Sequence, residues 1–321
     1  MAYGTPETPD EVEAYFTHIR GGRKPSAEAV EHLQERYRLV GGKTPLLEIT
    51  NEVAAKLQRT LRERGGNFNV YAGMKHWHPF IGEVMPQMAA DGVKRVVAFA
   101  LAPHCSRISV GGYRKAVEEA QEALGQPFDI PFIKCWHHNE NWRDLIANLV
   151  REGLLQFPEE ARSDVTVVFS AHSLPERIRT WDDPYERQLL ESSAAVAERV
   201  GLADWRFAWQ SAGNTGEPWL GPDILDYLDE LHTEGIRNVL SVPLGFVSDH
   251  LEILFDLEIE AKEKASSLGM TYHRTEMPNA RQDFIDVLAS VVEENLEAPV
   301  ACWCYPQLVQ VAPLRAVAAG E

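Results

Sequence analysis

The sequence has few cysteines, fewer basic than acidic residues and no long apolar run, and each scarcity excludes a class of protein. Four cysteines among 321 residues are too few for a disulfide framework, which favours a reduced, cytoplasmic setting. No run approaches the roughly 18 apolar residues of a membrane-spanning helix, so we expect no integral membrane segment. Residues 1–10, MAYGTPETPD, lack the basic and apolar regions of a signal peptide.

The charge balance excludes a second group of partners. The chain has 48 acidic and 31 basic residues, for a formal net charge of −17. Binding to nucleic acid or to an anionic membrane surface requires a basic footprint, so we expect neither partner. Hydrophobic residues at 45% and charged residues at 25% are ordinary globular values, and the length is sufficient for two domains.

Short β-like runs alternate with amphipathic helical patterns, which indicates parallel sheets joined by right-handed crossovers. We therefore predict an α/β protein of two Rossmann-like, doubly wound domains, each with a parallel four-stranded sheet. The domains are expected at residues 1–150 and 151–280, followed by a C-terminal helix over 281–295 and a loose tail over 296–321. The predicted strands cover residues 68–72, 95–101, 130–135, 164–169, 205–209, 239–244 and 270–274.

Residues 1–6, MAYGTP, have the pattern of a strand end and the turn that follows it. The strand itself is absent from the sequence as written. We therefore expect the first strand of the first sheet to be missing, which would leave one edge of that sheet unpaired.

Residues 238–264 combine a buried strand with a row of acids. The apolar run over 239–244 predicts the strand, and the spacing after it predicts an amphipathic helix that starts near Ser248 or Asp249. Glu252, Asp256 and Glu260 would lie in one line on that helix. Such a row is costly unless it is solvated or meets a cation. A solvated acidic face therefore remains an alternative to a cation site.

Three histidines, His76, His104 and His172, follow predicted strands. Ligands of open parallel sheets bind outside the carboxyl ends of the strands, where Tyr3 and Glu252 are also expected. Any one of these histidines on its own could be structural. Together with the carboxylates, they favour a metal or proton-transfer site. Neutral imidazole and carboxylate ligands suit ferrous iron or zinc.

A local basic cluster interrupts the acidic composition. Arg20, Arg23 and Lys24 surround a Gly-Gly turn, and Arg36 lies on the next predicted helix. Guanidinium groups bind carboxylates bidentately, so the cluster could clamp an acidic ligand. A basic turn with solvated side chains is the alternative.

Several stretches of the sequence resemble ferrochelatases, and more closely the monomeric coproporphyrin III ferrochelatases of Gram-positive-type bacteria. The order of SAHSLPE, WQSAGN and GFVSDHLE is the most specific part, and the resemblance covers roughly residues 1–295. The matching stretches are MAYGTP (1–6), YFTHIRGGRKP (15–25), ERYRLVGGKTPL (35–46), GMKHWHPFI (73–81), LAPHCS (101–106), SAHSLPERI (170–178), WQSAGNTGEPWLGPD (209–223), VPLGFVSDHLEILFDLEIE (242–260) and EMPNA (276–280).

The resemblance implies insertion of ferrous iron into a porphyrin in haem biosynthesis, by a cytoplasmic monomer with no tightly bound cofactor. Iron is a substrate in this reaction. By resemblance, His172 and Glu252 are the catalytic residues and inner metal ligands, on the side of the porphyrin opposite Tyr3. Asp256 and Glu260 match an outer divalent-metal site, for which Mg²⁺ is a candidate ion.

The resemblance also implies a set of porphyrin-binding positions. Thr44 stands at one of them where the family pattern leads us to expect serine. Because coproporphyrin III has four propionates and protoporphyrin IX has two, the basic cluster predicts coproporphyrin III as the preferred substrate. The positions are Tyr3, Arg20, Arg36, Tyr37, Thr44, His76 and Tyr113.

Other readings stay open at this point. One is a protoporphyrin IX ferrochelatase or another metal chelatase, such as a cobalt-inserting enzyme. Another is a non-enzymatic carrier of tetrapyrroles or metals. Cys302 and Cys304 resemble the C-terminal cysteines of relatives that carry an iron–sulfur cluster. Cys105 and Cys135 lie far upstream and no cysteine follows Cys304, so we expect no cluster.

Overall fold

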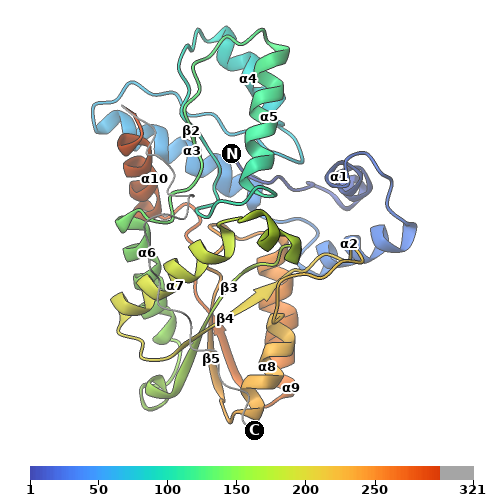
Figure 1. Cartoon of the computed structure of the whole chain (residues 1–321), viewed down its shortest axis with the longest axis vertical. Coiled ribbons are helices and arrows are strands. Elements are labelled where there is room, and N and C mark those ends of the chain that lie inside the picture. Colours follow the sequence, from blue (N-terminus) through green and yellow to red (C-terminus); the bar gives the residue numbers. More distant parts are fainter. Residues whose placement is uncertain (297–321) are drawn as a thin grey trace.

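The computed structural model describes residues 1–296, and the predicted loose tail with Cys302 and Cys304 lies almost wholly outside them. The fold is mixed α/β with parallel sheets, as predicted. In Figure 1 the elements of the first half lie at the top and those of the second half at the bottom, with α1 and α2 projecting to one side. No described helix is long and apolar enough to cross a membrane.

The second half is built on one four-stranded parallel sheet, in the order β4-β3-β5-β6. The central strand β3 pairs with β4 on one side and β5 on the other. β3 is almost wholly buried, which explains its nearly continuous apolar sequence. The strands are β3 (Val165–His172), β4 (Trp205–Gln210), β5 (Asn238–Val242) and β6 (Thr271–Arg274).

The first half differs from the prediction of a four-stranded sheet. Within the described residues its sheet has only two strands, the parallel pair β1 (Ala98–Phe99) and β2 (Phe132–Ile133). Residues 68–72 form no strand, because the Val70 N–H is taken by the Gln58 side chain instead of a neighbouring strand. A ladder of backbone bonds is what defines a strand, and this segment lacks one.

Met1–Tyr3 lie between two other extended segments. The Met1 amino group donates to the Phe99 carbonyl, and the Leu101 N–H donates to the Met1 carbonyl. On the other side Ala2 forms a parallel bridge with Met74. These residues therefore have backbone partners on both sides, and the expected unpaired edge does not lie at them.

The helices cover both sheets and form the projecting arm. Side-chain caps start three of them: Ser26 caps α2, Asn139 caps α6 and Asp223 caps α8, each accepting a backbone N–H of the first turn. The α-helices are α1 (Val12–Ile19), α2 (Ala27–Leu39), α3 (Leu46–Glu63), α4 (Ile81–Ala90), α5 (Val110–Ala123), α6 (Glu140–Leu154), α7 (Tyr185–Val200), α8 (Ile224–Thr233), α9 (Lys262–Ser267) and α10 (Gln282–Glu294).

The remaining helical segments are of other types. A π-helix, Glu252–Ala261, runs directly into α9. Short 3₁₀-helices cover Pro9–Glu11, Glu159–Asp164 and Glu176–Trp181. The helix begins at Leu251, two to three residues after the predicted start, because the Asp249 backbone and side chain both bond Asn279 and residues 248–250 stay a loop.

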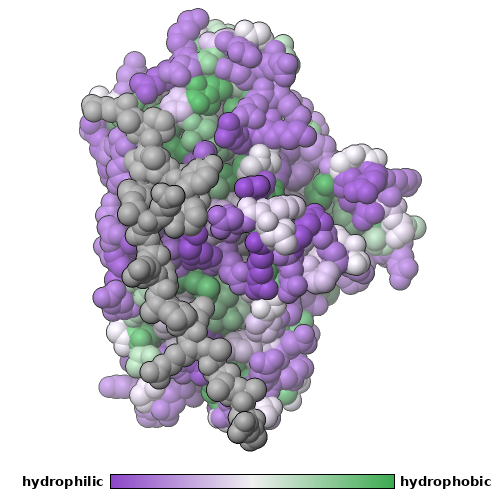
Figure 2. Space-filling model, in the orientation of Figure 1, coloured by the Kyte–Doolittle hydropathy of each residue, from purple (hydrophilic) through white to green (hydrophobic). Residues whose placement is uncertain are grey.

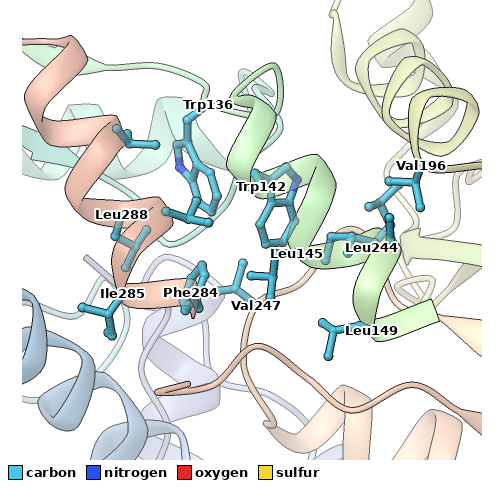
Figure 3. Packing of buried hydrophobic residues seen from close by; sticks show 14 of the residues in the cluster. Trp136, Trp142, Leu145, Leu149, Val196, Leu244, Val247, Phe284, Ile285 and Leu288 are labelled. Atoms are coloured by element: carbon cyan, nitrogen blue, oxygen red, sulfur yellow. The ribbon is translucent and has the colours of Figure 1, made fainter. Parts of the chain in front are cut away.

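One apolar core joins the two halves. Trp136, Trp142 and Phe284 are all buried and lie in edge and tilted ring contacts (Figure 3). α10 packs against both α3 and α6, so the end of the described chain returns to the first half. The predicted domain boundary at residue 150 falls inside α6, and the division into two domains stays a prediction. Truncating a buried aromatic such as Trp142 would cost about 3–5 kcal/mol.

Candidate functional site

His172 and Glu252 meet at the carboxyl end of the C-terminal sheet. His172 is the last residue of β3, and Glu252 is the first residue of the π-helix that follows β5. The His172 Nε2 atom lies 3.3 Å from Glu252 Oε1, and both side chains are 30% exposed. An imidazole and a carboxylate therefore form one partly accessible pair.

Gly245 makes this meeting possible. A Cβ at this position would lie 2.6 Å from the Ala171 Cβ, closer than side-chain carbons ever approach. The Gly245 N–H donates to the Ser170 carbonyl at 3.1 Å and fixes the loop against β3. The absence of a side chain thus lets the loop after β5 cross directly beside His172.

The pair is ionised in the absence of a ligand. Burial would lower the pKa of His172, but the Glu252 carboxylate and a hydrogen bond to the Ser173 carbonyl raise it to about 9. Burial would raise the pKa of Glu252, but His172 and His250 hold it well below its usual range. At neutral pH the pair therefore consists of an imidazolium and a carboxylate.

His250 is a further residue of the site that was not predicted from the sequence. Its Nε2 lies 3.5 Å from Glu252 Oε2, and its Nδ1 lies 2.9 Å from the Ser248 carbonyl oxygen. Each oxygen of Glu252 thus faces a different imidazole, and Phe246 packs on the ring of His250. A histidine two residues before the predicted metal ligand, in a loop at a strand end, was the available signal.

Asp256 and Glu260 do not form an open pair beyond Glu252. Asp256 is only 6% exposed, pairs with the Arg36 guanidinium and accepts the Ser211 hydroxyl proton. Burial raises its pKa to about 6, against the opposing charge of Arg36. A π-helix has hydrogen bonds between residues i and i+5 and therefore more residues per turn than an α-helix. Side chains four residues apart, such as Asp256 and Glu260, do not lie in one straight row along it.

Arg36 is therefore engaged inside the protein. It reaches Asp256 across 220 residues of sequence, and its guanidinium lies 4.5 Å from the centre of the Phe255 ring. Lys24 is paired with Glu13 at 2.7 Å on the surface. Of the predicted basic cluster, Arg20 and Arg23 form no ion pair with any described residue. Two of the four cations of the predicted cluster therefore already have a carboxylate partner in this structure, Arg36 inside the protein and Lys24 at the surface.

Tyr3 lies beside a second group of polar residues. It is 40% exposed, and its ring centre lies 4.5 Å from that of His76. The surrounding protein still desolvates the phenol, and together with the negative charge of Glu252 this raises the Tyr3 pKa, so Tyr3 lies within electrostatic reach of the His172–Glu252 pair. The His76 Nδ1 atom lies 3.2 Å from His18 Nδ1.

Lys75 is a further polar residue near Tyr3 that was not predicted from the sequence. Its ammonium lies 5.9 Å from the centre of the Tyr3 ring and 5.2 Å from that of Tyr113. Burial lowers its pKa to about 8. Both tyrosines stand at predicted porphyrin positions, so the Lys75 ammonium lies among those positions. In the sequence, only its place after a short extended segment could have indicated this role.

Three of the predicted porphyrin positions are closed. Tyr37 and Thr44 are 2% and 1% exposed, and both hydroxyls bond the Thr5 hydroxyl, at 3.1 and 3.0 Å. Tyr113 is also buried. These side chains lie beneath the surface and can support its shape. Of the predicted porphyrin positions that form no ion pair, only Tyr3, Arg20 and His76 reach the surface.

His104 does not join the site, which corrects the expectation that three histidines converge. It is 2% exposed, its Nε2 lies 2.9 Å from the Ser192 hydroxyl, and its ring stacks on that of His137. The strand end that carries it leads into the packed face under α7, so burial separates it from His172.

Comparisons with known proteins agree with these observations. A model of the family described as Ferrochelatase matches residues 1–296. The chain is 51% identical to the ferrochelatase of Herpetosiphon aurantiacus, over 91% of this chain and 96% of that protein. It is 42% identical to the coproporphyrin III ferrochelatase of Bacillus subtilis, over 92% and 96%. The fold resembles that of SirB from Bacillus subtilis with Fe³⁺, with a TM-score of 0.55 at 13% identity, over 78% of this chain and 94% of SirB.

Proposed function

Because the chain belongs to the ferrochelatase family, we propose that the His172–Glu252 pair inserts ferrous iron into coproporphyrin III. Family membership makes the chain a metal-insertion enzyme of haem biosynthesis that acts on iron and a porphyrin. The roles of individual residues and the identity of the porphyrin are our proposal. The observation that carries it is the partly exposed imidazole–carboxylate contact of 3.3 Å at two neighbouring strand ends.

Insertion exchanges one dication for two protons. Two pyrrole N–H protons leave the porphyrin as Fe²⁺ enters, so the total charge is conserved. In our proposal His172 first gives its Nε2 proton to Glu252, and the freed Nε2 lone pair holds iron. Once iron has passed to the porphyrin nitrogens, the same atom accepts one pyrrole proton. Glu252 supplies a hard oxygen ligand, and its second oxygen, which faces His250, passes protons away from the porphyrin.

The porphyrin must bend before its nitrogen lone pairs can face an incoming ion. Binding energy from remote groups can drive this distortion. We assign that role to contacts of the propionates with Arg20 and Arg23 on the arm of α1 and α2, and to packing on Tyr3. Lys75 is a third cation within this group of residues.

Two observations support coproporphyrin III over protoporphyrin IX. Arg20 and Arg23 can each form a charge-assisted pair, worth about 1.5–3 kcal/mol at best and less when exposed. Residues 1–296 also offer no apolar rim for a porphyrin with fewer propionates. Among the described residues only Tyr3, Leu39 and Leu155 are exposed large apolar side chains. Polar residues cover most of the face seen in Figure 2.

An outer ion at Asp256 and Glu260 is a second, separate proposal. Both carboxylates lie within electrostatic reach of Arg36. A divalent ion such as Mg²⁺ would therefore bind there only after the guanidinium leaves Asp256. We also propose that the enzyme works as a monomer in the cytoplasm.

The test of substrate choice is a side-by-side insertion assay. Ferrous iron is offered with coproporphyrin III and with protoporphyrin IX at low ionic strength, and kcat/KM is measured for each. We expect the parent enzyme to prefer coproporphyrin III, and R20A/R23A to lose about tenfold of that preference. R114A, which removes an exposed arginine of α5, is the matched control. Equal efficiency on both porphyrins would refute coproporphyrin III as the preferred substrate.

A further inference from the structure

We propose that Cys135, His137 and His138 form a second metal site, which binds a borderline divalent ion such as Zn²⁺. The proposal goes beyond iron insertion and does not depend on it. One ligand atom from each of these three side chains lies within 4.8 Å of the others. All three belong to the turn between β2 and α6, away from the residues assigned to the His172–Glu252 pair.

The backbone of this turn is held in place before any ion binds. The N–H groups of Trp136 and His137 both donate to the Pro103 carbonyl, at 3.0 and 3.1 Å. Asn139 then caps α6 by accepting the Trp142 N–H at 3.1 Å. Around tetrahedral Zn²⁺, neighbouring ligand atoms are about 3.5 Å apart, so the side chains need to close by about 1 Å. Rotation of the side chains supplies this movement without a change in the turn.

His137 has the hydrogen-bonding pattern of a metal ligand. It is 5% exposed, and its Nδ1 is buried without a hydrogen-bond partner in the part of the chain that the structure describes. Its Nε2 faces Glu191 Oε2 at 3.7 Å. This is an ion-pair distance, and closure by about 0.7 Å would let Nε2–H donate to the carboxylate and present Nδ1 as a lone pair. An ion at Nδ1 would satisfy the buried atom that otherwise costs free energy.

Cys135 determines which ions fit. Its side chain is buried and hydrogen-bonds the Gln188 side chain, whose Oε1 accepts the Cys105 N–H at 2.7 Å. Burial raises the pKa of the Cys135 thiol to about 12, and the hydrogen bond to Gln188 opposes that rise. When an ion binds, the thiol loses its proton to solvent and the S–metal bond forms. One thiolate and two imidazoles favour Zn²⁺ over Mg²⁺, which prefers oxygen ligands.

The ion would tie the turn before α6 to α7. Gln188 and Glu191, which contact Cys135 and His137, both lie on α7. The first residue of that helix, Tyr185, donates to the His172 carbonyl at 3.1 Å. His138 is half-buried, so an ion can enter on its side, where a water molecule completes the coordination. The site would therefore stabilise the support behind β3.

The test uses the full chain with Cys302 and Cys304 replaced by serine, so that Cys105 and Cys135 are the only thiols. Cobalt(II) is added without porphyrin, and thiolate-to-cobalt charge-transfer absorption is recorded. We expect the band in this protein and in C105S, and its loss in C135S. H138N and E191Q should each weaken cobalt binding about 10- to 100-fold. H172A, which removes the proposed inner metal ligand, should keep the band.

Two further measurements decide the outcome if C135S folds poorly. X-ray absorption of the zinc-loaded serine protein that also carries H172A should show one sulfur and two imidazole nitrogens around the ion. Zinc should also raise the melting temperature of H172A and not that of H172A/H138N. Coordination by nitrogen and oxygen alone, or a band that survives in C135S, would overturn the site. Iron insertion at the parent rate in H138N would show that this result is independent of the proposed function.

Discussion

Two acids on one helix, Glu252 and Asp256, have opposite surroundings. Glu252 is 30% exposed and has no arginine or lysine partner among the described residues, only two imidazoles that can release protons. Asp256, four residues later, is nearly buried under a guanidinium that cannot be deprotonated at any ordinary pH. A carboxylate can take part in proton transfer and metal binding when its charged partners can release a proton, as the two imidazoles at Glu252 can. A carboxylate paired with a group that stays charged, as Asp256 is with Arg36, has a structural role.

The largest expected effect is on chemistry at the Glu252 end. H172A and E252Q should each lower kcat for iron insertion by about 10²–10⁴-fold, because each removes a ligand and a proton acceptor. H250A should have a smaller effect, since it removes only the second neighbour of Glu252. Anaerobic assays of iron insertion give the rates, and quenching of porphyrin fluorescence gives the affinities. Porphyrin affinity close to that of the parent is the required control, and near-parent rates would contradict the assignment.

The second prediction concerns stability at the Asp256 end. R36A leaves a buried carboxylate without its cation and should lower the free energy of unfolding by about 3 kcal/mol. D256N should cost less, because the Asn side chain can still accept the Ser211 hydroxyl proton. Urea unfolding followed by circular dichroism measures both. R38A, on the same helix but paired only with Glu35 at the surface, is the matched control and should change little. An R36A enzyme as stable as the parent would mean that the pair contributes nothing.

The third prediction follows from the charge of His172. Its pKa of about 9 in the folded state lies above the ordinary value of about 6.5. The stabilisation from protonated His172 is therefore fully present below about pH 6.5 and is lost as pH rises through about 9. In E252Q the main cause of the raised pKa is gone, and the imidazole should titrate near or below 6.5.

Nuclear magnetic resonance of labelled histidine measures this titration directly. Because both side chains are partly exposed, the loss of stability in the parent between pH 6.5 and 9 should be only about 1–2 kcal/mol more than in E252Q. An imidazole that titrates at the same pH in both proteins would show that Glu252 does not control His172.

The smallest expected effect concerns the outer ion. D256N/E260Q should weaken the dependence of insertion on an added divalent ion about tenfold, with little change in porphyrin affinity. Varying Mg²⁺ at fixed iron and porphyrin provides the measurement. E263Q, which removes an exposed acid of α9, is the control. An unchanged dependence of insertion on the added ion would contradict the outer ion site and leave Asp256 with a structural role only.

Much of the second half could be predicted from sequence, because its strands are buried on both faces. The run that ends at His172 and the run before Gly245 are apolar enough to identify β3 and β5 without a structure. The two-stranded sheet of the first half could not be predicted. Whether residues 68–72 form a strand depends on neighbours supplied by distant segments, and the Gln58 side chain competes for the Val70 N–H.

The site, too, could be predicted from the sequence only in part. The positions of His172 and Glu252 follow from the rule that parallel strands present their carboxyl ends on one edge. His104 obeys the same local rule, yet packing under α7 buries it beside Ser192. The contact of Arg36 with Asp256 joins residues 220 apart, and no local pattern indicates it. The π-helix was also missed, because its apolar spacing resembles that of an α-helix.

The central claim is that Glu252 takes part in the chemistry and Asp256 does not. Single-turnover insertion of ferrous iron into coproporphyrin III that is already bound tests it most directly, by stopped-flow absorption of E252Q and D256N side by side. We predict that D256N forms Fe-coproporphyrin III at close to the parent rate, while E252Q forms almost none. A D256N enzyme as slow as E252Q, or an E252Q enzyme as fast as the parent, would contradict the claim.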